Sequence, residues 1–119
     1  MIVVDTNILL YLTIPTVHSV SVQLAWKKDP EWASPVLWRS EFKNAILVLI
    51  RKGVVSSEYA QKALERAAEV VDVHEYLPDD KLVMDLALRT TCSGYDCEFA
   101  ALARELETFL LTYDKKVLA

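Results

Sequence analysis

The sequence contains little glycine, few cysteines and no long hydrophobic run. Its 119 residues include only 2 Gly, 4 Pro and 2 Cys, which excludes collagen-like, low-complexity and disulfide-framework proteins. Cys92 and Cys97 are therefore expected to be reduced thiols. The longest uncharged apolar run, residues 45–50, is far shorter than the roughly 20 residues that span a bilayer. We expect no membrane anchor, no signal peptide and a cytoplasmic location.

The chain also lacks an excess of basic residues. Lys and Arg together number 13 against 17 Asp and Glu, a formal net charge of -4. This argues against a protein that holds nucleic acid by bulk electrostatics alone. A nucleic-acid enzyme is still allowed, because a cluster of acids that bound a metal ion would reverse the local sign of the charge.

Short apolar segments alternate with helical patterns along the whole chain, with no repeat or linker between them. We therefore expect one domain, residues 1–119, with 53% hydrophobic residues to build its core. The predicted strands are residues 2–4, 32–34, 71–74 and 109–111. The predicted helices are residues 7–12, 17–28, 35–52 and 56–68, one that opens at 78–80, and one over 93–106. This alternation predicts an α/β fold, an α/β/α sandwich around a short parallel sheet of four or five strands.

Four carboxylates occupy positions where an ordinary acid is unexpected. Asp5 and Asp114 follow the first and last predicted strands, whose carboxyl ends meet at one edge of a parallel sheet. Glu41 projects from an apolar stripe of the long helix, and Asp96 lies on the inward face of the last helix. A buried carboxylate without a base or a metal is costly. Oxygen ligands of this kind suit Mg²⁺ or Mn²⁺ and not zinc.

Each acid also has a purely structural interpretation. Asp5 and Asp114 could cap helices, Asp96 could form a capping box with Ser93, and Glu41 could pair with a neighbouring base such as Arg39 or Lys43. The metal interpretation is favoured because all four carboxylates lie at strand ends, helix ends or an apolar face, and no internal base compensates them.

Motifs of other enzyme classes are missing. His18 and His74 have no partner at metal-ligand spacing, and the sequence has neither a glycine-rich phosphate loop nor a G-x-S-x-G elbow. Residues 5–7 are similar to the start of the aspartyl-phosphate phosphatases, but Asn7 replaces their second acid. A phosphatase is therefore less favoured than either of the two hypotheses that follow.

Four segments, in order over essentially the whole chain, resemble the PIN-domain ribonucleases and in particular the VapC-like toxins of toxin–antitoxin pairs. The matching segments are Val3–Asn7, Glu41–Ala45 with Arg51–Gly53 below it, Tyr95–Ala103 and Leu110–Asp114. Chains of this family usually continue past the fourth acid through a short helix and a last strand. This chain ends at Ala119, so we expect a PIN-like domain without that strand.

The resemblance implies a metal-binding active site and its surroundings. The acids that it assigns to the metal site are Asp5, Glu41, Asp96 and Asp114, with Asn7 and Thr112 in the hydrogen-bonded surround. The leading hypothesis is hydrolysis of RNA phosphodiesters by one or two Mg²⁺ or Mn²⁺ ions. In this hypothesis Asp5 and Asp96 are direct ligands, and Glu41 and Asp114 bind a second ion or metal-bound waters. The candidate phosphate contacts are Arg39, Lys43, Lys115 and Lys116.

The rival hypothesis is a catalytically inactive PIN-like module that acts through a protein partner. The resemblance also implies a cognate antitoxin, whose tail would enter the acidic groove, and a homodimer. Residues 45–50 are apolar around most of the predicted helix, which suits either a subunit interface or a fully enclosed helix.

Overall fold

The structure, a computed structural model, describes residues 1–113 and confirms the α/β class. Its four described strands are parallel and form one sheet in the order β3-β2-β1-β4. The strands are β1 (Ile2–Val4), β2 (Trp32–Pro35), β3 (Glu75–Tyr76) and β4 (Leu110–Leu111). The helices are α1 (Thr6–Thr13), α2 (Ser19–Lys28), α3 (Trp38–Arg51), α4 (Ser57–Val71), α5 (Asp80–Arg89) and α6 (Gly94–Glu105).

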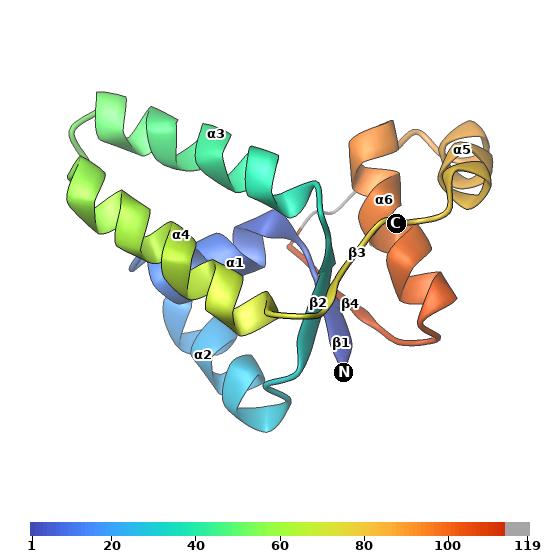
Figure 1. Ribbon diagram of the computed structural model, residues 1–119, viewed down its shortest axis with the longest axis horizontal. Coiled ribbons are helices and arrows are strands. Elements are labelled where there is room, and N and C mark those ends of the chain that lie inside the picture. The colour runs from blue at the N-terminus through green and yellow to red at the C-terminus, as the bar shows by residue number, and fades with distance from the viewer. Residues whose placement is uncertain (114–119) are drawn as a thin grey trace.

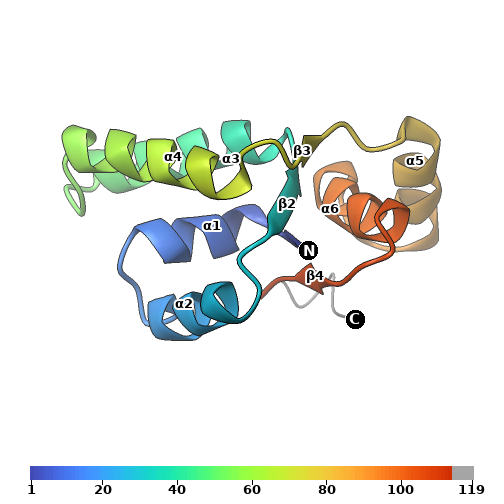
Figure 2. The same cartoon turned by 60° about the horizontal axis from the view of Figure 1, so that its bottom comes forward.

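The helices cover both faces of the sheet, as the predicted sandwich requires. Helices α1 to α4 lie on one face, and α5 and α6 lie on the other (Figure 1). Helix α1 is central in its layer and contacts α2, α3 and α4, as the turned view shows (Figure 2). Helix α6 packs on the sheet and α5 packs on α6. None of the helices within residues 1–113 is both long enough and apolar enough to cross a bilayer.

The central strand β1 is apolar because helices cover it on both sides. Val3 and Val4 are fully buried, and the strand pairs with β2 through Val3 and Ala33 and with β4 through Val3 and Leu110. Strands buried on both faces read as continuous apolar runs. All strands are parallel, so their carboxyl ends lie at one edge of the sheet.

The side chains of the strands divide between two cores. Val4 and Trp32 belong to the large core beneath α1 to α4, whereas Val3 and Ala33 pack against α6 in the small core. This division follows the alternation of side chains along a strand. Phe42 of α3 is fully buried in the large core, edge-on to Trp38 with 5.7 Å between the ring centroids. It anchors the first half of α3 to the sheet.

The predicted start of the long helix at Pro35 is wrong. Pro35 is the last residue of β2 and pairs with Tyr76 of β3, and the amide of Val36 donates to the carbonyl of Tyr76 at 2.9 Å. The backbone is thus held in the sheet through Val36, and α3 begins only at Trp38. At the other end Gly53, with φ of +72°, follows the helix as predicted.

The predicted strand over residues 71–74 is also wrong. Val71 is the last residue of α4 and is fully buried, because it continues the inward stripe of Ala60, Ala63 and Ala67. The chain leaves the helix at Asp72, whose φ is +50°, and β3 begins three residues further on, at Glu75. The alternation of apolar and polar residues at 71–74 therefore reflects a helix end and a turn.

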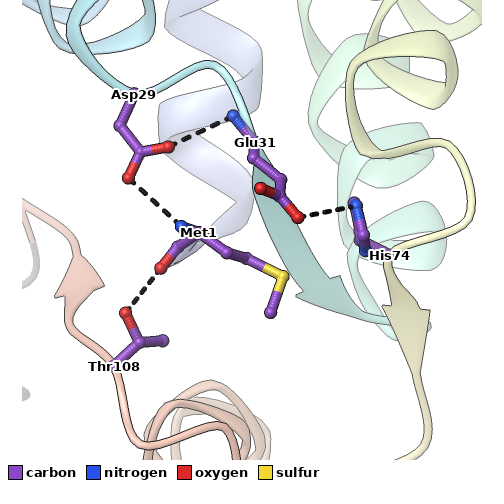
Figure 3. A network of polar contacts seen from close by, with 5 residues as sticks. All are labelled: Met1, Asp29, Glu31, His74 and Thr108. Atoms are coloured by element: carbon purple, nitrogen blue, oxygen red, sulfur yellow. Dashed lines mark hydrogen bonds and ion pairs between the residues drawn. The ribbon is translucent and has the colours of Figure 1, made fainter.

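A polar network joins the segments at the opposite, amino-terminal edge of the sheet (Figure 3). The amino group of Met1 pairs with Asp29 at 3.4 Å, and the hydroxyl of Thr108 donates to the carbonyl of Met1 at 2.6 Å. Beside them His74 contacts Glu31 at 3.3 Å. These contacts tie the start of β1 to the segments that lead into β2, β3 and β4, so polar bonds at this edge reinforce the register of the sheet.

Replacing Phe42 by alanine should lower the free energy of unfolding by about 3 to 5 kcal/mol, because it opens a cavity where a fully buried ring stood. Urea unfolding measures this change. Leu88→Ala, at an exposed position of α5, should stay within about 0.5 kcal/mol of the wild type. Equal unfolding midpoints for the two variants would contradict the central place of Phe42 in the core.

Candidate active site

A cleft of about 320 Å³ lies at the carboxyl edge of the sheet. Its wall includes five of the six site residues predicted from the sequence, which are Asp5, Asn7, Glu41, Asp96 and Thr112. Thr6, Asn44, Ala45, Val48, Phe99 and Leu110 complete the lining. Asp114 and the candidate phosphate contacts Lys115 and Lys116 lie outside the described residues. The structure thus brings together acids that are far apart in the sequence.

Asp5 occupies the junction between β1 and α1. One carboxylate oxygen, Oδ1, accepts a hydrogen bond from the amide of Ile8 at 3.1 Å and so caps α1. The other, Oδ2, accepts a hydrogen bond from the hydroxyl of Thr112, beyond the end of β4. The structural interpretation of Asp5 as a helix cap is therefore confirmed, and the same side chain lines the cleft. Its two hydrogen bonds fix the orientation of the carboxylate.

Glu41 lies in the first turn of α3 and is half-buried. Burial raises the pKa of its carboxyl above the usual value, and the negative charges of Asp96 and Asp5 raise it further. The hydroxyl of Thr6 donates to Glu41 Oε1 at 2.7 Å and opposes this rise in pKa. These influences show that the three carboxylates lie within electrostatic range of one another.

Asp96 lies in the first turn of α6, on the other face of the sheet from Glu41. Its amide donates to the hydroxyl of Ser93 at 3.1 Å, so Ser93 caps the helix, which is one of the two hydrogen bonds of the capping box considered for this pair. Figure 1 shows that the first turns of α3 and α6 approach the same edge of the sheet from opposite sides. The cleft therefore receives one acid from each helical layer and one from the end of the central strand.

The alternative interpretation, in which Glu41 pairs with Arg39 or Lys43, is wrong, because the ion pairs within residues 1–113 do not include Glu41. Arg39 instead pairs with Glu75 of β3, with 2.8 Å between Nε and Oε2, and its guanidinium lies over the Trp38 ring. The side chain of Arg39 is therefore held by Glu75 and not directed into the cleft, which argues against its role as a candidate phosphate contact. Lys43 takes part in none of the ion pairs within residues 1–113.

Sequence reasoning missed two polar residues of the site, Thr6 and Asn44. Thr6 is almost completely buried and hydrogen-bonds Glu41, and Asn44 lines the cleft one turn after Glu41. Their signals were available, because Thr6 follows Asp5 and Asn44 shares a helical face with Glu41. Glu98 is half-buried nearby, and burial first, then Glu41 and Asp80, raises the pKa of its carboxyl.

The donor set of the cleft fits a hard divalent cation. Asp5, Glu41 and Asp96 all offer carboxylate oxygen, which Mg²⁺ and Mn²⁺ prefer. Within residues 1–113, however, no three acidic, histidine or cysteine side chains are close enough to hold a metal ion by themselves. Mg²⁺ is commonly held by one or two carboxylates and several waters. The arrangement therefore suits an ion that keeps part of its water shell.

Comparison with known proteins identifies relatives over almost the whole chain. The family model of the PIN domain matches residues 2–119. A protein from Pyrobaculum aerophilum named Ribonuclease VapC3 is 28% identical, in an alignment that covers 98% of this chain and 91% of that protein. The crystal structure of PAE2754 from the same organism has a TM-score of 0.78 at 21% identity and covers 98% of this chain and 83% of that one. This last likeness supports the fold alone.

Replacing Glu41 by glutamine should raise the melting temperature at pH 7 in EDTA. The raised pKa means that the folded state favours the protonated carboxyl, so ionised Glu41 opposes folding. The amide oxygen of glutamine can still accept the hydrogen bond of Thr6.

The pH dependence of stability expected for Glu41 is opposite to that of a carboxylate paired with a base. Stability from Glu41 is present at low pH and is lost as the pH rises through the raised pKa, so the two melting temperatures should converge below about pH 4. Glu65→Gln, on the exposed side of α4, is the control and should change neither value. A lower melting temperature for E41Q at pH 7 would show that the cleft does not disfavour this charge.

Proposed function

Because the chain belongs to the PIN-domain family, we propose that it is a metal-dependent ribonuclease that hydrolyses RNA phosphodiesters. The observation that carries this proposal is the convergence of Asp5, Glu41 and Asp96 on one cleft at the carboxyl edge of the sheet. The name of the relative Ribonuclease VapC3 supports the same activity. The catalytic set in this proposal is Asp5, Glu41, Asp96 and Asp114, the last of which lies outside the described residues.

PIN nucleases generally use divalent metal ions. When bound, Mg²⁺ or Mn²⁺ supplies a nucleophilic hydroxide at neutral pH and neutralises charge on the leaving oxygen. We assign Asp5 and Asp96, which both line the cleft, as direct ligands. Glu41 and Asp114 are assigned to a second ion or to metal-bound waters. Burial first, and then the negative charges of Asp96 and Asp5, raise the pKa of Glu41, and a bound cation would offset the repulsion among these acids.

Hydroxyl groups hold the acids in place in this mechanism. Thr112 donates to Asp5 and Thr6 donates to Glu41, so a hydroxyl group helps to orient each of these carboxylates. Groups that orient metal ligands commonly change metal affinity or activity by 10- to 100-fold when removed, as a rough guide. Asn7 is exposed on the cleft wall beside Asp5, where its amide can donate to a phosphate oxygen. No protein nucleophile is required.

The biological role that we propose is that of the toxin in a toxin–antitoxin pair. The relative named Ribonuclease VapC3 supports RNA as the substrate. The cognate antitoxin protein as inhibitor and the cytoplasmic location are further parts of the proposal. The homodimer that the resemblance implies remains part of this proposal.

The alternative is a catalytically inactive PIN-like module that acts through a protein partner. It is favoured by one observation, namely that the acids within residues 1–113 do not form a group close enough to hold a metal on their own. The two experiments below separate the nuclease from this alternative, because a binding module needs no turnover.

The purified chain should cleave an end-labelled RNA pool with Mg²⁺ or Mn²⁺ and not with EDTA. Asp96→Asn and Asp5→Asn should each lower the rate by about 100-fold or more, because loss of a ligand exceeds the usual effect of losing its supporting group. Asp85→Asn, at a partly exposed position of α5 outside the cleft, is the matched control and should cleave like the wild type. Cleavage that persists in EDTA or in both site variants would reject the proposed mechanism.

Binding of the ion should also be visible without any turnover. A ligand at about 100 times its dissociation constant stabilises the fold by about 2.7 kcal/mol, so Mn²⁺ should raise the melting temperature of the wild type. Asp96→Asn should abolish this increase and Asp85→Asn should retain it. A clear Mn²⁺ shift in a chain that cleaves no RNA would favour the inactive module.

A further inference from the structure

A second depression, of about 540 Å³, adjoins the cleft. It lies between α3 and the first turn of α6 and shares Glu41 and Asn44 with the cleft. Its own lining includes Leu37, Lys43, Leu47 and Tyr95. We call this depression the α3 groove. A strand bound at the acids could pass Asn44 and continue into the groove without leaving the surface.

Tyr95 gives the α3 groove an exposed aromatic ring. The residue is 63% exposed, although it precedes Asp96 in the first turn of a capped helix. Leu47, on the α3 side, is 42% exposed. Because Tyr95 lies in the first turn of α6, its backbone has a defined position beside the acids. Its ring is exposed and is available to a ligand. Nucleic-acid bases stack on exposed aromatic rings of this kind.

Lys43 gives the same groove a positive charge. The residue is exposed, and the ion pairs found within residues 1–113 do not include it. Arg39, one turn before it, is held by Glu75. Lys43 thus offers an ammonium group within a groove that joins an acidic cleft, which is the charge pattern expected where a phosphate backbone passes from a metal site to the protein surface.

We propose that the α3 groove is a nucleotide subsite for single-stranded RNA, in which the base next to the scissile phosphate stacks on Tyr95 and the following phosphate contacts Lys43. This inference rests on the proposed function, since it deepens the description of the substrate. Stacking requires an unpaired base, so the subsite selects single strands and accepts every base in a similar way. Asn44, at the junction with the cleft, donates to the base edge or to a ribose hydroxyl.

Binding is tested first, without turnover. The probe is a short, fluorescein-labelled single-stranded RNA of mixed sequence, and its anisotropy is measured in EDTA with the full chain carrying Asp5→Asn. In this background Tyr95→Ala should weaken binding about tenfold, because the base loses its stacking contact with the aromatic ring. Tyr95→Phe keeps the ring and should bind normally, as should the control Tyr59→Ala on α4.

The role of Lys43 is tested by salt. Lys43→Gln should make the dependence of log affinity on log salt concentration shallower by about 0.7, the value for one phosphate contact on a single strand. Lys62→Gln, at an exposed position of α4, should leave the slope unchanged. An unchanged slope for K43Q would remove Lys43 from the subsite.

The outcomes separate this inference from the proposed function. In the wild-type background with Mn²⁺, Tyr95→Ala should raise KM about tenfold and leave kcat nearly unchanged. Cleavage with an unaltered KM would overturn the subsite and leave the ribonuclease intact. RNA binding that depends on Tyr95, in a chain that cleaves nothing, would support the subsite and overturn the nuclease. If the chain carrying Asp5→Asn does not bind RNA, the subsite is overturned. The same holds if Tyr95→Ala changes the mass in solution and leaves the RNA affinity unchanged.

Discussion

Repulsion among the carboxylates of Asp5, Glu41 and Asp96 is the constraint on which the arrangement of this molecule depends. A chain that places these acids at one edge of a sheet must hold them there against their mutual electrostatic repulsion. Each acid lies at the start of a helix, namely α1, α3 or α6, where the positive end of the helix dipole favours a negative charge. The parallel sheet makes this possible, since it directs helix starts to the edge where its strands end.

The hydrophobic core supplies the stiffness that this edge needs. Phe42 is fully buried directly after Glu41, and Phe99 is buried one turn after Asp96. The helical turns that carry these two acids are therefore anchored in the core. The almost completely buried hydroxyl of Thr6 adds a hydrogen bond inside the same wall. Functional sites commonly lower the stability of the folded protein, as the repulsion among these acids does, and burial of the surrounding core compensates. Glu41 is the clearest example, because its half-burial raises the pKa of its carboxyl and so disfavours the ionised form in the folded protein.

The sequence predicted the backbone positions of the acids better than their surroundings. Asp5 follows an unbroken apolar strand, and Glu41 interrupts an apolar helical stripe, so both patterns were local. The order of the strands was not predicted, because it depends on which strand the helical crossovers leave in the centre. Pro35 was misassigned because its pairing with Tyr76 is formed by residues far away in the sequence. Thr6 was missed for a similar reason, since its partner Glu41 is remote in the chain.

The attachment of β4 has a consequence for amide hydrogen exchange. Two amides of the central strand region point toward this last short strand, since Val3 donates to the carbonyl of Phe109 at 2.9 Å and Asp5 donates to that of Leu111 at 3.3 Å. Both lose their acceptors if β4 peels away, and Thr112 then leaves Asp5. Slow exchange depends on such hydrogen bonds remaining closed. The deuterium uptake of these two amides therefore reports how often one wall of the cleft opens in the folded protein.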